Sequence, residues 1–219
     1  MGIITAIRVS TPPRIDGSTG DAVWGQATPI TEFTQRELHE GSPSTERTEV
    51  RIVYDDRALY IGIWCYDRDA SGIISSQMQR DFNLDLEDNV GIIIDTYHDR
   101  RNGFQFYVNP NGARADALVT DEGQGVNTDW NALWDARATV TSNGWFTEIE
   151  IPFSTLRFTD DSDQVWGINF VRNIRRKQEQ DLWQGFQRNY GLQKVSRAGL
   201  LLGLKNIRRG DAIQVKPYL

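Results

Sequence analysis

The stretch Thr48–Asp67, TEVRIVYDDRALYIGIWCYD, indicates the fold class of this chain. Apolar and polar residues alternate up to Tyr54, Asp55-Asp56 supplies a turn, and a second run returns from Ala58 to Tyr66. Because successive side chains of a strand point to opposite faces, this pattern predicts two antiparallel strands joined as a hairpin. On the return strand, one face carries Leu59, Ile61, Ile63 and Cys65, and the other carries Tyr60, Trp64 and Tyr66.

Further short strands are predicted along the rest of the chain, at Val90–Thr96, Gly103–Asn109, Arg114–Thr120, Ala136–Thr141, Trp145–Ile151, Val165–Arg175 and Ala198–Lys205. Between two of them, Asn143-Gly144 favours a type I′ hairpin turn, since both residue types tolerate positive φ. Thr34–Arg47 is polar and is predicted to be a loop. The pattern predicts an all-β fold: an antiparallel β-sandwich with jelly-roll or immunoglobulin-like layering and few short helices. We expect residues 1–219 to form one domain.

Composition narrows the function classes. The 219 residues are 39% hydrophobic and 25% charged, which is typical of a globular protein, and the net charge of −6 disfavours nucleic acid as a partner. No apolar run reaches the roughly 18 residues that a membrane-spanning helix needs. The start of the chain has no basic and apolar segments typical of a secretory signal, so we expect a domain excised from a longer chain.

Several kinds of chemistry are disfavoured. The two histidines, His39 and His98, are far apart in sequence and are not spaced as metal ligands, and Cys65 is the single cysteine. A zinc site of Cys and His is therefore not expected. Cys65 lies in a predicted strand and is expected to be a small buried hydrophobic residue. No glycine-rich phosphate loop is present, so no nucleotide is expected.

Acidic residues leave two alternatives open. Glu148 and Glu150 lie on one predicted strand face, with side chains about 7 Å apart, so they could form a glycosidase pair or simply a solvated face. We favour the solvated face. Asp95, Asp99 and Asn102 form a short oxygen-rich loop that suits calcium, although Asp and Asn are also ordinary turn residues.

The predicted strand Phe104–Asn109, FQFYVN, carries the most informative surface. Phe104, Phe106 and Val108 share a face that requires a core, whereas Gln105, Tyr107 and Asn109 share the opposite face. Two amides and a phenol could bind a neutral polar ligand such as a sugar, whose apolar face stacks on aromatic rings while amides satisfy its hydroxyls. Candidate rings are those of Trp64, Tyr107, Trp130, Trp134 and Trp183, although a core position is the default for any single Trp.

Six blocks in a fixed order then carry a family resemblance: IDGSTGDAVWGQA (15–27), TEVRIVYDDRALYIGIWCYD (48–67), EDNVGIIIDTYHD (87–99), FQFYVNPNGARAD (104–116), GWFTEIEIPFSTLRF (144–158) and WGINFVRN (166–173). The chain resembles a family 9 carbohydrate-binding module, and more closely the family-9-like domain at the N-terminus of large bacterial outer-membrane-associated proteins. The resemblance implies noncatalytic binding of a polysaccharide or oligosaccharide, calcium as a structural ion, and a role in glycan degradation or uptake. It also implies an exported, periplasmic or outer-membrane-associated protein, with a C-terminal membrane β-barrel domain of the same full-length chain as a partner.

The sugar-binding members hold a terminal sugar between two tryptophans. In this sequence Asp85 stands near the first of these positions, with Phe82 the only nearby aromatic, and Trp183 is the counterpart of the second. A sugar-binding glutamate is replaced by Gly91 and an arginine by Tyr107. Other residues that match the outer-membrane-associated relatives are Arg80, Asp81, Asp88, Asp116 and Arg172, which could contact a ligand or form a buried polar network that shapes a loop.

Other functions remain as alternatives. The domain could have kept the sandwich and lost the sugar site, serving as a structural or protein-interaction module, or it could assist a glycoside hydrolase with weak hydrolysis. A haem-binding relative would need axial ligands, for which only His39, His98 and Met78 are available, so no haem is expected. The predicted ligand-binding set is therefore Arg80, Asp81, Asp88, Gln105, Tyr107, Asn109, Asp116, Trp130, Trp134, Arg172 and Trp183.

Overall fold

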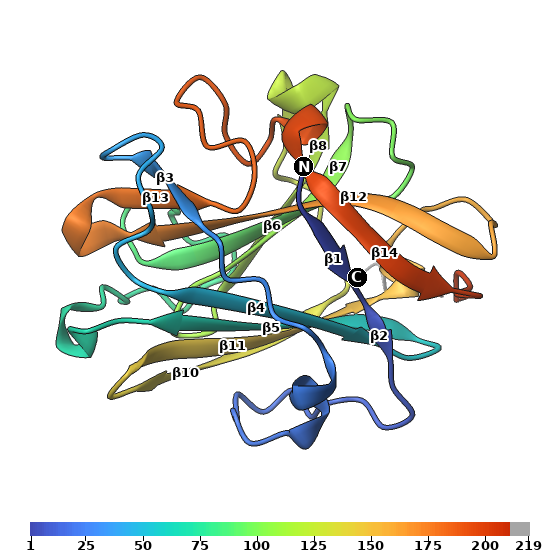
Figure 1. Cartoon of the computed structure of the whole chain (residues 1–219), viewed down its shortest axis with the longest axis horizontal. Helices are drawn as coiled ribbons and strands as arrows, with labels where there is room; N and C mark the ends of the chain where they lie inside the picture. Colours follow the sequence, from blue (N-terminus) through green and yellow to red (C-terminus); the bar gives the residue numbers. More distant parts are fainter. Residues whose placement is uncertain (211–219) are drawn as a thin grey trace, which may run out of the picture.

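The computed structural model describes residues 1–210 and confirms the all-β sandwich (Figure 1). The larger sheet, sheet A, has the order β1-β14-β12-β6-β7-β8-β9, with β13 beside β12 and β3 beside β13. Its strands are β1 (Ile3–Thr5), β3 (Thr34–Glu37), β6 (Asn89–Asp95), β7 (Gly103–Val108), β8 (Arg114–Thr120), β9 (Gly125–Asn127), β12 (Asp163–Ile174), β13 (Glu179–Leu182) and β14 (Gly199–Lys205).

The second sheet, sheet B, has the order β10-β11-β5-β4-β2 and lies below sheet A in Figure 1. Its strands are β2 (Ile7–Arg8), β4 (Thr48–Tyr54), β5 (Ala58–Tyr66), β10 (Asp135–Thr141) and β11 (Gly144–Pro152). The hairpin predicted from Thr48–Asp67 is confirmed, with Val50 opposite Ile63 and Ile52 opposite Ile61. Its turn is fixed by Asp55, whose Oδ1 accepts the N–H groups of Arg57 and Ala58 at 2.8 and 2.9 Å.

Helical structure in residues 1–210 consists of short 3-10 turns: η1 (Ala22–Gln26), η2 (Ala70–Gly72), η3 (Asp121–Gly123), η4 (Phe153–Thr155), η5 (Arg175–Lys177) and η6 (Val195–Arg197). None of these is of a length and apolarity that could cross a membrane.

The main core fills the space between the sheets, where inward-facing side chains of both meet. Phe106 and Val108 of β7 are fully buried there, and Phe104 packs against the same core, as the alternation predicts. Cys65 is also fully buried, and burial raises the pKa of its thiol to about 12. The expectation of an unreactive apolar cysteine is therefore confirmed.

Both outer faces are partly covered. The segment around η1 lies on the outer side of sheet B, where Trp24 packs with Val53 and Tyr60. On sheet A, Leu192 and Val195 pack over outward-facing residues of β6, β8 and β12. This second cover leaves Ala115 and Ala117 of β8 and part of Tyr107 of β7 uncovered, and a hollow remains there.

Two predictions need correction. Thr34–Arg47, predicted to be a loop, contains strand β3, because pairing with β13 orders this segment. The β10–β11 hairpin exists as predicted, but its two connecting residues are Ser142 and Asn143, and only Gly144 has positive φ (126°). The turn is therefore not of type I′, and Gly144 is needed because a Cβ there would stand 2.1 Å from the carbonyl oxygen of Cys65.

Candidate functional site

A hollow of about 360 Å³ lies on the outer face of sheet A over β7 and β8, and we call it the Tyr107 hollow. Its lining comes from five short segments of the chain: Asp81, Phe82, Leu84, Gln105, Tyr107, Ala115, Asp116, Ala117, Val126, Thr128 and Gln193. Of the predicted ligand-binding residues, the structure brings Asp81, Gln105, Tyr107 and Asp116 together here.

The floor of the hollow is deep because β8 contributes two small side chains there, next to two large side chains of β7. In the β7–β8 pairing Tyr107 stands opposite Ala115 and Gln105 opposite Ala117. Tyr107 leans away from these alanines onto β6, where it stands opposite Gly91. A Cβ at Gly91 would lie 2.3 Å from Cε1 of Tyr107, so the ring occupies the space that any side chain at position 91 would need.

A chain of neutral hydrogen bonds crosses the hollow. Nε2 of Gln193 donates to Oε1 of Gln105 at 3.3 Å, and Nε2 of Gln105 donates to the Tyr107 hydroxyl at 3.1 Å. Burial raises the pKa of Tyr107 to about 12, so its phenol stays protonated at physiological pH. Because the hydroxyl already accepts a hydrogen bond from Gln105, its own proton remains to be donated, and linked bonds of this kind polarise one another.

The walls are mainly apolar. Phe82 is buried and Leu84 is half-buried in the loop of residues 73–88, whereas Val126 is 41% exposed on the opposite rim. Asp81 anchors the loop because its N–H donates to the carbonyl of Arg114 at 2.8 Å, and Asp81 has φ 58°. Apolar walls with amide and phenol groups at the base match the division of labour that sugar binding requires.

Asp116 lines the hollow but is committed to a structural network. Its carboxylate pairs with Arg80 and accepts the indole N–H of Trp134 at 2.8 Å and the N–H of Ala132 at 2.9 Å. Arg80 also donates to the carbonyl of Ala132 at 3.3 Å. The network ties the segment before β10 to β8, so Arg80 and Asp116 hold the wall of the hollow in place.

The predicted aromatic platform does not form at this hollow. Trp134 packs edge-on against Phe106 at 5.1 Å, and Trp130 lies 5.4 Å from Phe104, so both rings sit on the core side of β7, opposite Tyr107. Trp183 is 6% exposed and packs against Phe170 within the core. These three tryptophans therefore do not line the Tyr107 hollow, because their rings pack against Phe104, Phe106 and Phe170.

Three more predicted residues are structural. Asn109 is fully buried and bonds Glu87 and the carbonyl of Gln77, while Asp88 accepts the N–H groups of Ile74 and Arg175. Arg172, 2% exposed, donates to the carbonyls of Arg47 and Tyr66 and to Thr48. These side chains fasten loops and strands together, and none of them lines the Tyr107 hollow.

The Glu148–Glu150 pair is not the solvated face that we expected. Glu148 is fully buried and accepts hydrogen bonds from the indole N–H of Trp24 and the N–H groups of Asp16 and Gly17 at 3.0, 3.2 and 3.0 Å. Burial raises its pKa. Glu148 thus holds the segment around η1 on the outer side of sheet B, and the geometry gives no support to a hydrolytic role for Glu148.

The loop predicted to bind calcium forms a hydrogen-bonded turn. Asp95 accepts the N–H groups of Asp99 and Arg100 at 3.2 and 2.7 Å, and Asp99 accepts that of Asn102 at 2.9 Å. In the part of the chain that the structure describes, no group of three or more His, Cys, Asp or Glu residues is arranged to hold a metal ion. Structural calcium at Asp95, Asp99 and Asn102 stays a prediction.

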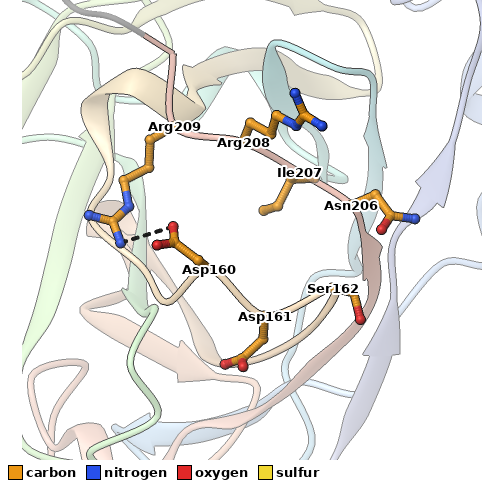
Figure 2. A pocket seen from close by; sticks show the side chains of 7 residues that line it. All are labelled: Asp160, Asp161, Ser162, Asn206, Ile207, Arg208 and Arg209. Carbon is orange, nitrogen blue, oxygen red and sulfur yellow. Dashed lines mark hydrogen bonds and ion pairs between the residues drawn. The ribbon is translucent and has the colours of Figure 1, made fainter.

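A larger hollow, of about 600 Å³, lies between the Asp160–Ser162 turn and residues 206–209 (Figure 2). Figure 2 shows Arg209 on one side paired with Asp160, and Ile207 projecting into the space. The Arg209–Asp160 ion pair spans 3.4 Å. Its lining contains no aromatic ring and a single apolar side chain among charged and polar ones. It therefore suits the stacking of a sugar ring less well than the Tyr107 hollow.

Comparison with known proteins places this geometry in a family. The family model described as "carbohydrate family 9 binding domain-like" matches residues 15–186. This chain belongs to that family. A search of curated protein sequences finds no match.

Solved structures support the same fold for this family 9 domain. It is similar to a carbohydrate-binding module of family 9 from Caldicellulosiruptor kristjanssonii in complex with cellotriose, with a TM-score of 0.66, 17% identity, and coverage of 99% of this chain and 100% of that one. The same module in complex with glucose gives a TM-score of 0.64 at 18% identity, covering 99% and 100%. A protein from Bacteroides uniformis gives 0.69 at 12% identity, covering 92% and 98%.

In this family 9 domain, the two positions that the resemblance matches to the clamp tryptophans do not form a clamp. Asp85, at the first position, has a side chain 92% exposed and paired with Arg175. Trp183, at the second, lies in the core. The replaced pair, Gly91 and Tyr107, stands in direct register, and the tyrosine ring covers the glycine. Gly91 and Tyr107 therefore form one closely packed pair, in which a neutral ring fills the space beside the glycine.

Sequence reasoning missed most of the hollow's lining, including Phe82, Leu84, Ala115, Ala117, Val126, Thr128 and Gln193. Ala115 and Ala117 could have been predicted as lining residues from the sequence. The segment 109–113 closes a hairpin, so Ala115 and Ala117 necessarily pair with Tyr107 and Gln105. Two small residues opposite two large polar ones on a shared face indicate a depression in the sheet.

Proposed function

We propose that this domain is a noncatalytic carbohydrate-binding domain whose ligand lies in the Tyr107 hollow. The observation that carries the proposal is the neutral Gln193–Gln105–Tyr107 hydrogen-bond chain at the base of an apolar hollow, in a chain of this family. The related module from Caldicellulosiruptor kristjanssonii is described in complex with cellotriose and with glucose, which supports a glycan as the ligand.

Each part of the hollow has a role in this proposal. Phe82, Leu84 and Val126 offer apolar surface to the C–H face of a sugar ring. The Tyr107 hydroxyl donates to a sugar oxygen, and the free lone pairs of Gln105 and Gln193 accept from sugar hydroxyls. Because Tyr107 and the two glutamines are neutral, we expect a neutral saccharide and a weak dependence of affinity on salt.

Filling the hollow tests its role directly. Ala115→Trp places a large ring on the floor opposite Tyr107, and we expect glycan affinity to fall at least about tenfold, since the ligand loses its contact surface. The measurement is isothermal titration calorimetry with oligosaccharides found by a glycan array. The control is Val165→Trp on β12, where the parent side chain is 43% exposed and lies outside the hollow. Equal affinity of both variants would place the ligand elsewhere.

Removing the Tyr107 hydroxyl should have a smaller effect. Tyr107→Phe keeps the ring over Gly91 and removes one neutral donor, for which we expect a three- to tenfold loss of affinity, or about 0.5–1.5 kcal/mol. The melting temperature should change little, which separates lost recognition from lost folding. Unchanged affinity would exclude the phenol as a ligand contact.

The alternative of an interaction module is favoured by a specific observation: Met78 and Leu86, in the loop beside the hollow, are 79% and 62% exposed. This alternative would be favoured if the domain is folded and binds no glycan across a broad array.

For the whole protein we further propose export, a periplasmic or outer-membrane-associated location, and a place in a glycan-degrading or glycan-uptake system. The resemblance supports these last proposals.

A further inference from the structure

The opposite outer face of the sandwich carries a second aromatic hollow, of about 420 Å³, at one end of β5 and β11. We call it the Trp64 hollow. Trp64 and Tyr66 of β5 lie half-buried on this face of sheet B, and Phe146 of β11 stands opposite Trp64. Gly144 stands opposite Tyr66, so the space beside the tyrosine has no side chain of β11 in it.

The Trp64 ring is held rigidly in position. The ring covers Gly62 of the same strand, since a Cβ at Gly62 would be 3.0 Å from Cζ3 of Trp64. Phe146 packs beside it at 4.5 Å and Trp24 meets it edge-on at 6.0 Å. A ring fixed in this way loses little conformational freedom when a ligand stacks on it, and such preorganisation favours binding.

The polar part of the Trp64 hollow is neutral. Thr19, Thr141 and Asn143 are exposed at its edge, and no acidic or basic side chain is among its lining residues. The nearest cations stack on its rings: Arg51 lies 5.7 Å from the Trp64 ring and Arg47 lies 5.0 Å from that of Tyr66. Both arginines pair with Glu49 at 2.6 Å, so its carboxylate balances one of their two positive charges.

The surface continues beyond the Trp64 hollow. An adjoining hollow of about 470 Å³ shares Tyr66 and Asn143 with it, so the two hollows lie next to each other at these residues, and together we call them the groove. The far part is lined by Thr45 and Ser142 and by charged residues that include Glu46, which pairs with Lys177 and Arg176. A groove of two connected hollows suits a ligand of several linked units better than a single small molecule.

We propose that this groove is a second carbohydrate-binding surface, which takes a neutral oligosaccharide by stacking a sugar ring on Trp64 or Tyr66 and bonding its hydroxyls to Thr19, Thr141 and Asn143. Fixed aromatic rings beside neutral hydroxyl and amide groups are the groups that recognise neutral sugars. Because the Tyr107 hollow lies on the outer face of sheet A and this groove on that of sheet B, one domain can hold two glycan chains at once. Bivalent contact with a polysaccharide would raise its overall affinity without new contacts.

The test is a titration of the ¹⁵N-labelled domain with cellotetraose, xylotetraose, mannotetraose and maltotetraose, followed by NMR. The indole signal of Trp64, assigned from a Trp64→Phe variant, and the amide signals of Ala115 and Ala117 report on the two surfaces separately. We expect the Trp64 indole to move saturably with at least one of these sugars. Tyr66→Ala should weaken that response about tenfold and leave the response of Ala115 and Ala117 unchanged.

Two matched variants separate the possible outcomes. Tyr107→Phe should leave the Trp64 response intact, and Thr141→Trp, which fills the groove from an exposed position on β10, should abolish it. If the amide signals of Ala115 and Ala117 shift while the indole signal of Trp64 does not, this inference is overturned and the proposed function is supported. Movement of Trp64 alone would support this inference and overturn the assignment of the Tyr107 hollow, and no movement at either surface would overturn both.

Discussion

A Gly91→Ala variant is expected to lose about 1–3 kcal/mol of unfolding free energy, the usual cost of forcing an extra methyl into a packed site. The new Cβ would stand 2.3 Å from Cε1 of Tyr107 and 2.7 Å from two further ring carbons, so ring or backbone must move. The ring can move only outward into the Tyr107 hollow, which breaks its alignment with Gln105. The same variant should therefore also weaken glycan binding, as calorimetry would measure.

The pairing of Gly91 with Tyr107 makes a rescue possible. In Gly91→Ala/Tyr107→Ala the obstructing ring is gone, so adding the methyl group should cost almost nothing in the Tyr107→Ala background. Urea unfolding of the four proteins would give a coupling free energy of at least about 1 kcal/mol. Gly25→Ala is the matched control, because no atom lies within 4 Å of a Cβ at Gly25. If Gly91→Ala were as stable as this control, the close packing of Tyr107 on β6 would be wrong.

A second large effect is expected at Asp181, which is fully buried on β13. Burial raises the pKa of its carboxyl from 3.8 to about 7, against the hydrogen bond from Ser44, and the nearby charge of Glu179 adds to the rise. Its Oδ1 has no hydrogen-bond partner within the described residues. The folded protein therefore holds a proton on Asp181 at a pH where the unfolded chain has released it.

This difference fixes the sign of the pH dependence. Between about pH 4 and pH 7 the folded state binds more protons at Asp181 than the unfolded state, so the contribution of this group to stability falls as pH rises. The loss is on the order of 4 kcal/mol across that window. Asp181→Asn cannot ionise, so we expect it to flatten the decline and to exceed the wild type in stability at pH 8.

Urea unfolding at a series of pH values would measure the effect. The comparison reports on Asp181 and its influence on Glu179, because the more distant buried carboxyls titrate in both proteins. Asp85→Asn serves as the control, since the Asp85 side chain is 92% exposed. Parallel pH profiles for wild type and Asp181→Asn would show that the proton resides elsewhere.

Local alternation in the sequence was enough to predict the principal strands and the inward face of β7. It also predicted that Gln105 and Tyr107 lie together on the outer face, and the structure has them in one hollow. These predictions succeed because strand periodicity and hairpin pairing depend on residues close in sequence. The short strands β3 and β13 were missed because their partners, and not their own residues, order them.

The remaining errors have a common physical cause. Trp183 follows β13 directly, and without that strand its inward direction could not be read from alternation. Gln193 reaches Gln105 across 88 positions of sequence, and Arg172 reaches Arg47 across 125. Whether a polar side chain meets a ligand or a distant backbone carbonyl depends on such long-range packing, which composition and spacing do not encode.

Strand β1 has a mechanical consequence. It runs parallel to β14, with Ile3, Ile4 and Thr5 opposite Leu200, Leu201 and Leu202, and the chain then crosses to sheet B as β2. A force that pulls the beginning of β1 and the end of β14 apart acts along both strands, so their hydrogen bonds are loaded together in shear and must break together. Forced unfolding is governed by the unfolding rate. A domain that grips a polysaccharide while its chain is under tension would therefore resist extension at this pair of strands first.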